Sequence, residues 1–379
     1  MKIKQVQAIP LQRQLEEIFE GGTYRITSRN TIVTRVELDN GVVGETFGGD
    51  EDQYQLDVVR LVNEHYQPLL LGQDVRDIES HWQRMWDCRV DIGNRGIHCL
   101  DLAKHCVHSQ AIAAVDIALW DALGKALDQP VYKMLGGDRD RVPVIAIGGY
   151  IRAGTTTADV EAEVKDLLDL GIHGMKLKVG KRSVEEDIER AKIARRAGGD
   201  AFFLCVDANQ AWTVEEAVQF AKGAIEAKLA WLEEPVRWYA QIEGNARVRK
   251  VGIPVNAGQG EISRHGCEEM VNRGAVDILN VDVTIAGGVT EWKRIADMAA
   301  DSNIRMAHHE EAQVALHLLA AIPHGICVEI FPSYQRDPMW FDLPEKQPSI
   351  QDGHMLLPTG PGFGLPLKQE TIERWRPAD

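Results

Sequence analysis

From Val142 to Phe331 the chain repeats one pattern, in which a short apolar segment is followed by an amphipathic stretch. The apolar segments have the length and β-branched content of buried strands. They lie at 142–149, 174–180, 201–210, 229–235, 253–259, 276–283, 304–310 and 326–331. The stretches between them, such as 157–171 and 213–227, have the apolar spacing of helices. Eight strands separated by seven helices predict an α/β fold, a closed (β/α)7β TIM-like barrel, in preference to an open doubly wound sheet.

The N-terminal part of the chain has a different pattern. Two runs rich in β-branched residues flank Asn40-Gly41, a dipeptide typical of hairpin turns. From about 53 to 135 the apolar spacing becomes helical. We therefore predict an α+β domain over 1–125 and the barrel over 126–350. We expect the Gly- and Pro-rich tail, about 351–379, to pack back on the first domain.

Charge and composition exclude several classes of protein. The 379 residues include 42 Lys and Arg against 57 Asp and Glu, a net charge of −15 that opposes binding to nucleic acid. No apolar run approaches the roughly 20 residues of a membrane span. The cysteines lack the paired spacing of a disulfide or zinc framework. We expect a soluble cytoplasmic protein with a small-molecule partner, no nucleic acid and no membrane contact.

Polar residues recur where the predicted strands end. In a parallel barrel these ends share one face, which carries the active site. The residues follow one another at intervals of 20 to 29 positions, and they are Lys178, Asp207, Glu233, Gln259, Asp282, His309 and Glu329. So many polar groups in one small mouth are costly unless a ligand or metal satisfies them.

The acidic members of this set predict a metal site. Asp207, Glu233 and the pair Gln259/Glu261 offer hard oxygen ligands from neighbouring strands, as Mg²⁺ prefers. Each acidic residue taken alone is better explained as a helix cap or a surface carboxylate. Their regular spacing favours one divalent ion per subunit.

Two further groups predict acid–base chemistry. Lys176 and Lys178 are two apart, so they share a strand face, and we expect their repulsion to lower the pKa of one amine. Without the neighbouring carboxylates, the pair would be better explained as a phosphate site or as solvated lysines. Asp282 precedes His309 by one strand–helix unit and would orient its imidazole, whereas His308 should face away from the interior. Two bases around a metal suit removal of a proton α to a carboxylate.

The motifs also carry a family resemblance. The chain resembles the enolase superfamily, in its mandelate racemase subgroup, in segments 111–137, GMKLKVG, VDANQAW, WLEEP, VDVTIAGGVTEW and the final HH…HLLAA…VE run. The resemblance implies an N-terminal capping domain over a barrel, a Mg²⁺ cofactor and a homo-oligomer, commonly a dimer or octamer.

The resemblance also implies roles for individual residues. Lys178 matches the base of the Lys-x-Lys motif, and Lys176 matches its neighbour at the substrate carboxylate. The other matches are Asp207 and Glu233 as metal ligands, Asp282 and His309 as the dyad, Glu329 as the acid at the substrate carboxylate, and Asn209 as a substrate contact. Where the family has a Gly-Glu pair with the third ligand, this chain has Gly258-Gln259. Either Gln259 binds the metal through its amide, as glucarate dehydratases of the superfamily use an amide, or Glu261 replaces it.

In the family, two loops of the capping domain set specificity. Here they correspond to 17–28, with Tyr24 and Arg25 as substrate contacts, and to 48–52. Their polarity favours a polyhydroxylated substrate, although both are equally compatible with ordinary exposed loops.

The resulting prediction is a Mg²⁺-dependent lyase, a dehydratase of an aldonate or aldarate. It would remove the α proton with Lys178 or His309 and expel the β hydroxyl, giving a 2-keto-3-deoxy acid. The alternatives are a racemase or epimerase of a 2-hydroxy acid, which needs the same residues, and a sugar-acid binding protein without activity.

Overall fold

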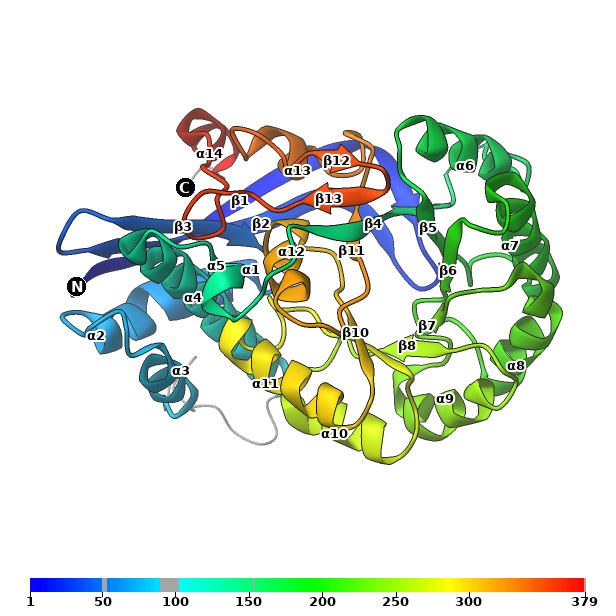
Figure 1. Ribbon diagram of the computed structural model, residues 1–379, viewed down its shortest axis with the longest axis horizontal. Helices are drawn as coiled ribbons and strands as arrows, with labels where there is room; N and C mark the ends of the chain where they lie inside the picture. Colours follow the sequence, from blue (N-terminus) through cyan, green and yellow to red (C-terminus); the bar gives the residue numbers. More distant parts are fainter. Residues whose placement is uncertain (50–52, 89–101, 153, 378–379) are drawn as a thin grey trace.

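The N-terminal domain is built on a three-stranded antiparallel sheet. The computed structural model describes residues 1–49, 53–88, 102–152 and 154–377. The sheet has the order β1 (Ile3–Glu20), β2 (Arg25–Leu38) and β3 (Val43–Gly48) (Figure 1). The predicted turn at Asn40-Gly41 is confirmed, because Gly41 takes a φ of 86° and its N–H donates to the carbonyl of Leu38.

Helices pack against this sheet and against one another. They are α1 (Gln55–Arg60), the π-helical turn η1 (Leu61–Tyr66), α2 (Gln67–Leu70), α3 (Ile78–Trp86), α4 (Leu102–Leu127) and the short α5 (Val131–Met134). The apolar α4 packs on β2 and β3, and its other side meets the barrel helix α11. There Asp116 accepts hydrogen bonds from the backbone N–H and hydroxyl of Thr290, at 2.9 and 2.7 Å. Within the described residues, no helix combines the length and apolar character needed to cross a membrane.

The barrel contains all eight predicted strands and the seven helices between them. The strands are β4 (Arg141–Gly148), β5 (Gly174–Lys178), β6 (Phe203–Asp207), β7 (Leu232–Glu233), β8 (Val255–Ala257), β9 (Ile278–Asn280), β10 (Arg305–Ala307) and β11 (Val328–Ile330). The helices are α6 (Asp159–Asp169), α7 (Val184–Gly198), α8 (Val214–Gly223), α9 (Gln241–Arg249), α10 (Arg264–Asn272), α11 (Gly288–Asp301) and α12 (Ala312–Ala320), with single turns η2 (Ile225–Ala227) and η3 (Trp238–Ala240). The predicted (β/α)7β fold is therefore confirmed.

The strands are parallel from β4 through β10, and β11 pairs with β4. Met306 of β10 closes the ring, since its N–H donates to His324 and its carbonyl accepts from the N–H of Ile326, just before β11. Local capping fixes where helices begin. Ser183 and Thr213 each form a reciprocal capping box, with Glu186 and Glu216 respectively, so α7 and α8 start immediately after them.

An apolar layer fills the lower part of the barrel interior. It consists of side chains from alternate positions of the strands, namely Ile145, Cys205, Trp231, Ile278, Ala307 and Cys327. Period two then places the next interior residues, two positions further along each strand, at the mouth. The polar side chains at the carboxyl ends of the strands therefore lie above this apolar layer.

The C-terminal tail contacts both domains. The hairpin of β12 (Ile350–Gln351) and β13 (His354–Leu356) pairs antiparallel with the first half of β4. The helix α13 (Pro338–Asp342) lies before this hairpin, and α14 (Gln369–Trp375) packs against β1. Gln369 donates to Glu45 of the N-terminal sheet at 3.0 Å.

Candidate active site

The polar residues predicted at the strand ends meet at the barrel mouth. A pocket of about 450 Å³ opens there between the strand ends and the β1–β2 hairpin. Among its lining residues are Lys178, Asn209, Gln259, His309, Tyr24 and Arg25. Directly beneath these, Lys176, Asp207, Glu233 and Glu329 are almost completely buried.

Lys176 is the centre of the deepest charge cluster. Its ammonium donates to Glu233 at 2.8 Å and to Glu329 at 2.7 Å, and its exposed fraction is 0%. Burial alone would lower the pKa of Lys176, but the two facing carboxylates outweigh burial and hold that pKa well above its ordinary value. Lys176 is thus a fixed cation.

Lys178 lies one layer higher and is paired with Asp207. The ammonium donates to Oδ2 of Asp207 at 2.6 Å and lies over the rings of Tyr24 and Tyr150, at 5.5 and 5.9 Å. The prediction of a lowered lysine pKa is wrong for Lys178 while its ammonium is paired with Asp207. Burial does act to lower the pKa of Lys178, but the charge of Asp207 raises it well above its usual range. Repulsion between the two lysines is a smaller effect than attraction to the carboxylates.

Glu233 is supported by residues that the sequence prediction missed. Its carboxylate accepts from the indole of Trp231 at 3.0 Å and from the amides of Asn256 and Asn280 at 3.3 and 2.9 Å. Asn280 lies two positions before Asp282, so the alternation that paired Lys176 with Lys178 would have predicted it. These donors fix the carboxylate in one orientation.

The two candidates for a third metal ligand, Gln259 and Glu261, lie in different surroundings. Gln259 lines the pocket, and none of the described residues donates a hydrogen bond to its buried Oε1. Glu261 is not brought to this site, because its Oε1 accepts from Gln241 of α9 at 3.2 Å. Within the described part of the chain no three His, Cys, Asp or Glu side chains form a metal cluster. Two carboxylates and an unsatisfied amide oxygen nevertheless fit a hard cation such as Mg²⁺.

Asp282 and His309 form the predicted contact. Oδ2 of Asp282 lies 2.9 Å from Nδ1 of His309, and Thr284 donates to the other oxygen through its N–H and its hydroxyl, at 2.7 and 2.6 Å. The imidazole is therefore held with Nε2 toward the pocket. His308 packs outside the ring against Trp292 and accepts from the N–H of Val283 at 3.2 Å.

Several residues at the mouth have a left-handed backbone although they are not glycine. Asn209, Gln210, Glu234, Glu310 and Glu311 have φ between 38° and 61°, and each follows a strand end. This conformation costs free energy and persists where the surrounding structure enforces it, most often at functional sites. It breaks the strand alternation, so Glu234 and Glu310 reach the pocket although period two would turn them outward. No pattern in the sequence predicted this.

The segment 17–28 is mostly β-structure. Strands β1 and β2 continue to Glu20 and from Arg25, leaving a tight turn at 21–24 instead of a long loop. Thr23 of this turn donates to the carbonyl of Asn209 at 2.9 Å, and Glu20 exchanges two backbone hydrogen bonds with Ile151. The hairpin is thereby attached to the barrel rim. The acidic residues Asp50, Glu51 and Asp52 of the second expected loop lie outside the described residues.

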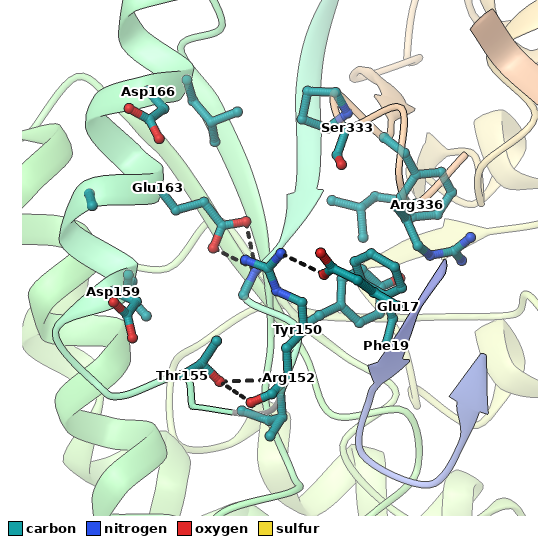
Figure 2. A pocket seen from close by; sticks show the side chains of 18 of the residues that line it. Glu17, Phe19, Tyr150, Arg152, Thr155, Asp159, Glu163, Asp166, Ser333 and Arg336 are labelled. Atoms are coloured by element: carbon teal, nitrogen blue, oxygen red, sulfur yellow. Dashed lines mark hydrogen bonds and ion pairs between the residues drawn. The ribbon is translucent and has the colours of Figure 1, made fainter. Parts of the chain in front are cut away.

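A larger hollow of about 910 Å³ lies beside the mouth, between the hairpin and α6. Its rim carries an ion pair between Arg152 and Glu17 at 3.2 Å, and Glu163 accepts the N–H of Gly149 (Figure 2). Arg336 lines both spaces and lies over the ring of Phe331 at 4.0 Å, turned away from the acidic side chains of α6. None of the predicted catalytic or metal-binding residues lines this hollow.

The arrangement at the mouth can act on a carboxylic acid. A lysine and an oriented imidazole face one polar pocket, above carboxylates that suit a divalent ion. Such a set can bind a carboxylate, remove an adjacent proton and deliver another.

Comparison with known families matches both parts of the chain. Residues 159–371 match the family described as enolase C-terminal domain-like, and residues 22–136 match the mandelate racemase / muconate lactonizing enzyme N-terminal domain. A crystal structure of a mandelate racemase/muconate lactonizing enzyme from a marine actinobacterium, in complex with magnesium, superposes with a TM-score of 0.89. It is 37% identical, over 100% of this chain and 99% of that one.

Two characterised relatives differ in their reactions. A 3,6-anhydro-alpha-L-galactonate cycloisomerase from Streptomyces coelicolor is 31% identical over 371 residues, covering 97% of this chain and 96% of the relative. An L-talarate/galactarate dehydratase from Salmonella typhimurium is 33% identical over 309 residues, covering 81% and 72% respectively.

Proposed function

Because the chain belongs to the enolase superfamily, in its mandelate racemase/muconate lactonizing enzyme group, we propose that it is a Mg²⁺-dependent acid-sugar dehydratase. The substrate is an aldonate or aldarate, and the product is a 2-keto-3-deoxy acid. The cycloisomerase and dehydratase relatives both act on acids of the sugar series, which supports this substrate class.

One observation carries the proposal. Lys178 from β5 and His309 from beyond β10 face the same pocket, with β4 and β11 between them in the closed sheet. Dehydration of a 2,3-dihydroxy acid needs a base at carbon 2 and an acid at the hydroxyl of carbon 3.

The pocket lining supports a substrate rich in hydroxyl groups. The hairpin contributes Thr23, Thr27, Ser28 and Asn30. Two buried acceptors, Oδ1 of Asn209 and Oε1 of Gln259, receive no hydrogen bond from the described residues. Hydroxyl groups of a sugar acid, or a cation at Gln259, would supply the missing partners.

Asp207, Glu233 and Gln259 are the residues that would hold Mg²⁺. When bound, the ion neutralises the substrate carboxylate and stabilises the negative charge that develops as the α proton leaves. In this structure the ammonium of Lys178 donates to the carboxylate of Asp207. If that carboxylate also held a divalent ion, the pKa of Lys178 would fall, and its amine could act as a base.

The remaining residues hold the substrate and move protons. Lys176 would donate to one oxygen of the substrate carboxylate, and Glu329, paired with Lys176 at 2.7 Å, would donate to the other oxygen in its protonated form. Lys178 takes the proton from carbon 2. His309, held by Asp282, protonates the hydroxyl that leaves carbon 3 as water.

The test is a screen of the purified protein with Mg²⁺ against aldonic and aldaric acids, with 2-keto acids detected by semicarbazide. We expect at least one acid to lose water, and we expect protein treated with EDTA to be inactive. If every acid stays intact with Mg²⁺ present, the dehydratase proposal is wrong.

A cycloisomerase is the second candidate, because the Streptomyces coelicolor relative matches nearly the whole chain. Mass spectrometry separates the two reactions, since isomerisation leaves the mass of the substrate unchanged and dehydration removes one water. A racemase would instead exchange the α proton for deuterium without a change of skeleton. A binding protein would retain a sugar acid in calorimetry without converting it.

A further inference from the structure

His309 has a carboxylate beside each ring nitrogen. Oδ2 of Asp282 lies 2.9 Å from Nδ1, and Oε1 of Glu310 lies 3.5 Å from Nε2. The first contact belongs to the predicted dyad. The second involves a residue that the sequence prediction did not single out.

The backbone of Glu310 explains how it reaches the ring of the preceding residue. Its φ of 48° is left-handed, which ends the strand alternation and turns the side chain into the mouth. Its N–H donates to Oε2 of Glu329 at 3.1 Å, so the same residue is fixed to the deep charge cluster. The side chain is only 8% exposed. A buried acid with a strained backbone is typical of functional sites, where the surrounding structure enforces the conformation.

We propose that Glu310 is a positioning residue which, together with Asp282, holds His309 as an imidazolium before the substrate arrives. His309 then enters the reaction as the acid, and Lys178 is left as the base. The role of His309 as the acid rests on the proposed function, but the test of its protonation does not.

The charges around His309 come from several elements, and they favour the protonated ring. Asp282 follows β9 and Glu310 follows β10, whereas Lys176 of β5 opposes protonation. Arg29 of β2 lies 3.8 Å from Glu310. Arg336, after β11, also acts on Glu310, and Glu234, after β7, interacts with His309.

Burial alone would lower the pKa of His309, but Glu310 and Asp282 raise it to about 9. The pKa of Glu310 falls to about 2, because His309, Arg29 and Arg336 outweigh its own burial. Both partners are therefore charged near neutral pH.

With His309 protonated, each proton transfer in the reaction has one donor and one acceptor. Lys178 must first release to solvent the proton that it donates to Asp207. The proton on carbon 2 then goes to its amine, and the electron pair of that C–H bond forms the double bond to carbon 3. The C–O bond at carbon 3 breaks as His309 gives its Nε2 proton to the oxygen, which leaves as water. The enol product becomes the 2-keto acid by taking a proton at carbon 3 and losing the hydroxyl proton at carbon 2.

The test is nitrogen NMR of the full-length protein labelled with ¹⁵N-histidine, with Mg²⁺ present and no substrate. The His309 signals are assigned from their absence in His309→Asn. In the wild type we expect both ring nitrogens to remain protonated through pH 7.5. In Glu310→Gln, which keeps the shape of the side chain, we expect the pKa of His309 to fall by about one unit or more.

Glu311→Gln is the matched control. Glu311 also has a left-handed backbone, but its side chain accepts from the N–H of Gly49 at 2.9 Å and contacts Gln313. Burial, with the neighbouring Asp282, raises the pKa of Glu311 to about 8, so the substitution removes little charge at neutral pH. We expect the titration of His309 to stay within a few tenths of a unit of the wild type.

Two results would overturn the inference. One is a neutral His309 in the wild type at pH 7.5, which needs no variant to fold. The other is an unchanged titration in a folded Glu310→Gln. Because no turnover is measured, a protonated His309 in a protein that dehydrates no acid sugar would contradict only the proposed function.

Discussion

Gly22, at the tip of the β1–β2 hairpin, lies so close to Ala208 after β6 that a Cβ on residue 22 would be 2.2 Å from the Ala208 carbonyl oxygen. This contact involves two backbones, so neither can move aside as a flexible side chain would. The position of the hairpin over Lys178 and Asn209 thus depends on the absence of one methyl group.

Gly22→Ala should displace the hairpin from the barrel rim. We expect kcat/KM for the dehydrated acid to fall about tenfold or more, which corresponds to about 1.4 kcal/mol of lost transition-state binding. Steady-state kinetics checks this. An enzyme with unchanged kcat/KM would show that the hairpin contact does not hold the site.

Arg152→Ala is the control for the hairpin. Arg152 pairs with Glu17 of the same hairpin, but both side chains are about half exposed, and exposed pairs contribute roughly 0–1 kcal/mol. We expect its kcat/KM to stay within about threefold of the wild type. A loss of kcat/KM as large as that of Gly22→Ala would indicate that the functional site lies in the larger hollow.

Lys178 and His309 should each be needed for dehydration. We expect Lys178→Ala and His309→Asn to lower kcat by about 10²–10⁴-fold, because each removes one proton-transfer group. Near-wild-type turnover in both variants, measured with the best acid from the screen, would refute the assigned roles. Circular dichroism confirms that the variants remain folded.

Gln259 and Glu261 should differ in their effect on metal binding. We expect Gln259→Ala to weaken Mg²⁺ binding by about tenfold or more, since it removes an oxygen ligand. Glu261→Ala should have little effect, because Glu261 is hydrogen-bonded to Gln241 away from the mouth. Titration calorimetry with Mg²⁺ measures both, and the reverse order would identify Glu261 as the ligand.

His309 should make stability depend on pH in the alkaline range. Its pKa of about 9 in the folded protein exceeds its ordinary value of 6.5. The protonated ring therefore stabilises the fold fully below pH 6.5, and this stabilisation is lost as the pH rises through 9. We expect the difference in unfolding free energy between the wild type and His309→Asn to shrink between pH 6.5 and 10. Denaturant titrations at several pH values measure it, and a constant difference would contradict the pKa.

The regular part of this molecule could be predicted from the sequence because it follows strand periodicity. Eight apolar segments gave eight strands, and period two placed Lys176 and Lys178 on the same interior face. The irregular part could not be predicted this way. Glu234 and Glu310 reach the mouth through a left-handed backbone that no alternation describes.

The charge states of the two lysines could not be predicted from the sequence either. The neighbouring lysines suggested repulsion, but each ammonium donates to a carboxylate of another strand at 2.8 Å or less. Those carboxylates are 29 or more positions away along the chain. Which opposite charge a buried group meets depends on the order of strands around the ring. That order is a property of the closed fold.

Strand β4 joins three partners: β5, which follows it, and β11 and β13, whose paired residues come 184 to 215 positions later. During synthesis one edge of the first barrel strand therefore stays uncovered until β11 and β13 have been made. Until then it exposes unpaired backbone to other molecules. The barrel is thus completed only after residue 356 has been synthesised, and chains arrested before that residue should be targets for chaperones or proteases.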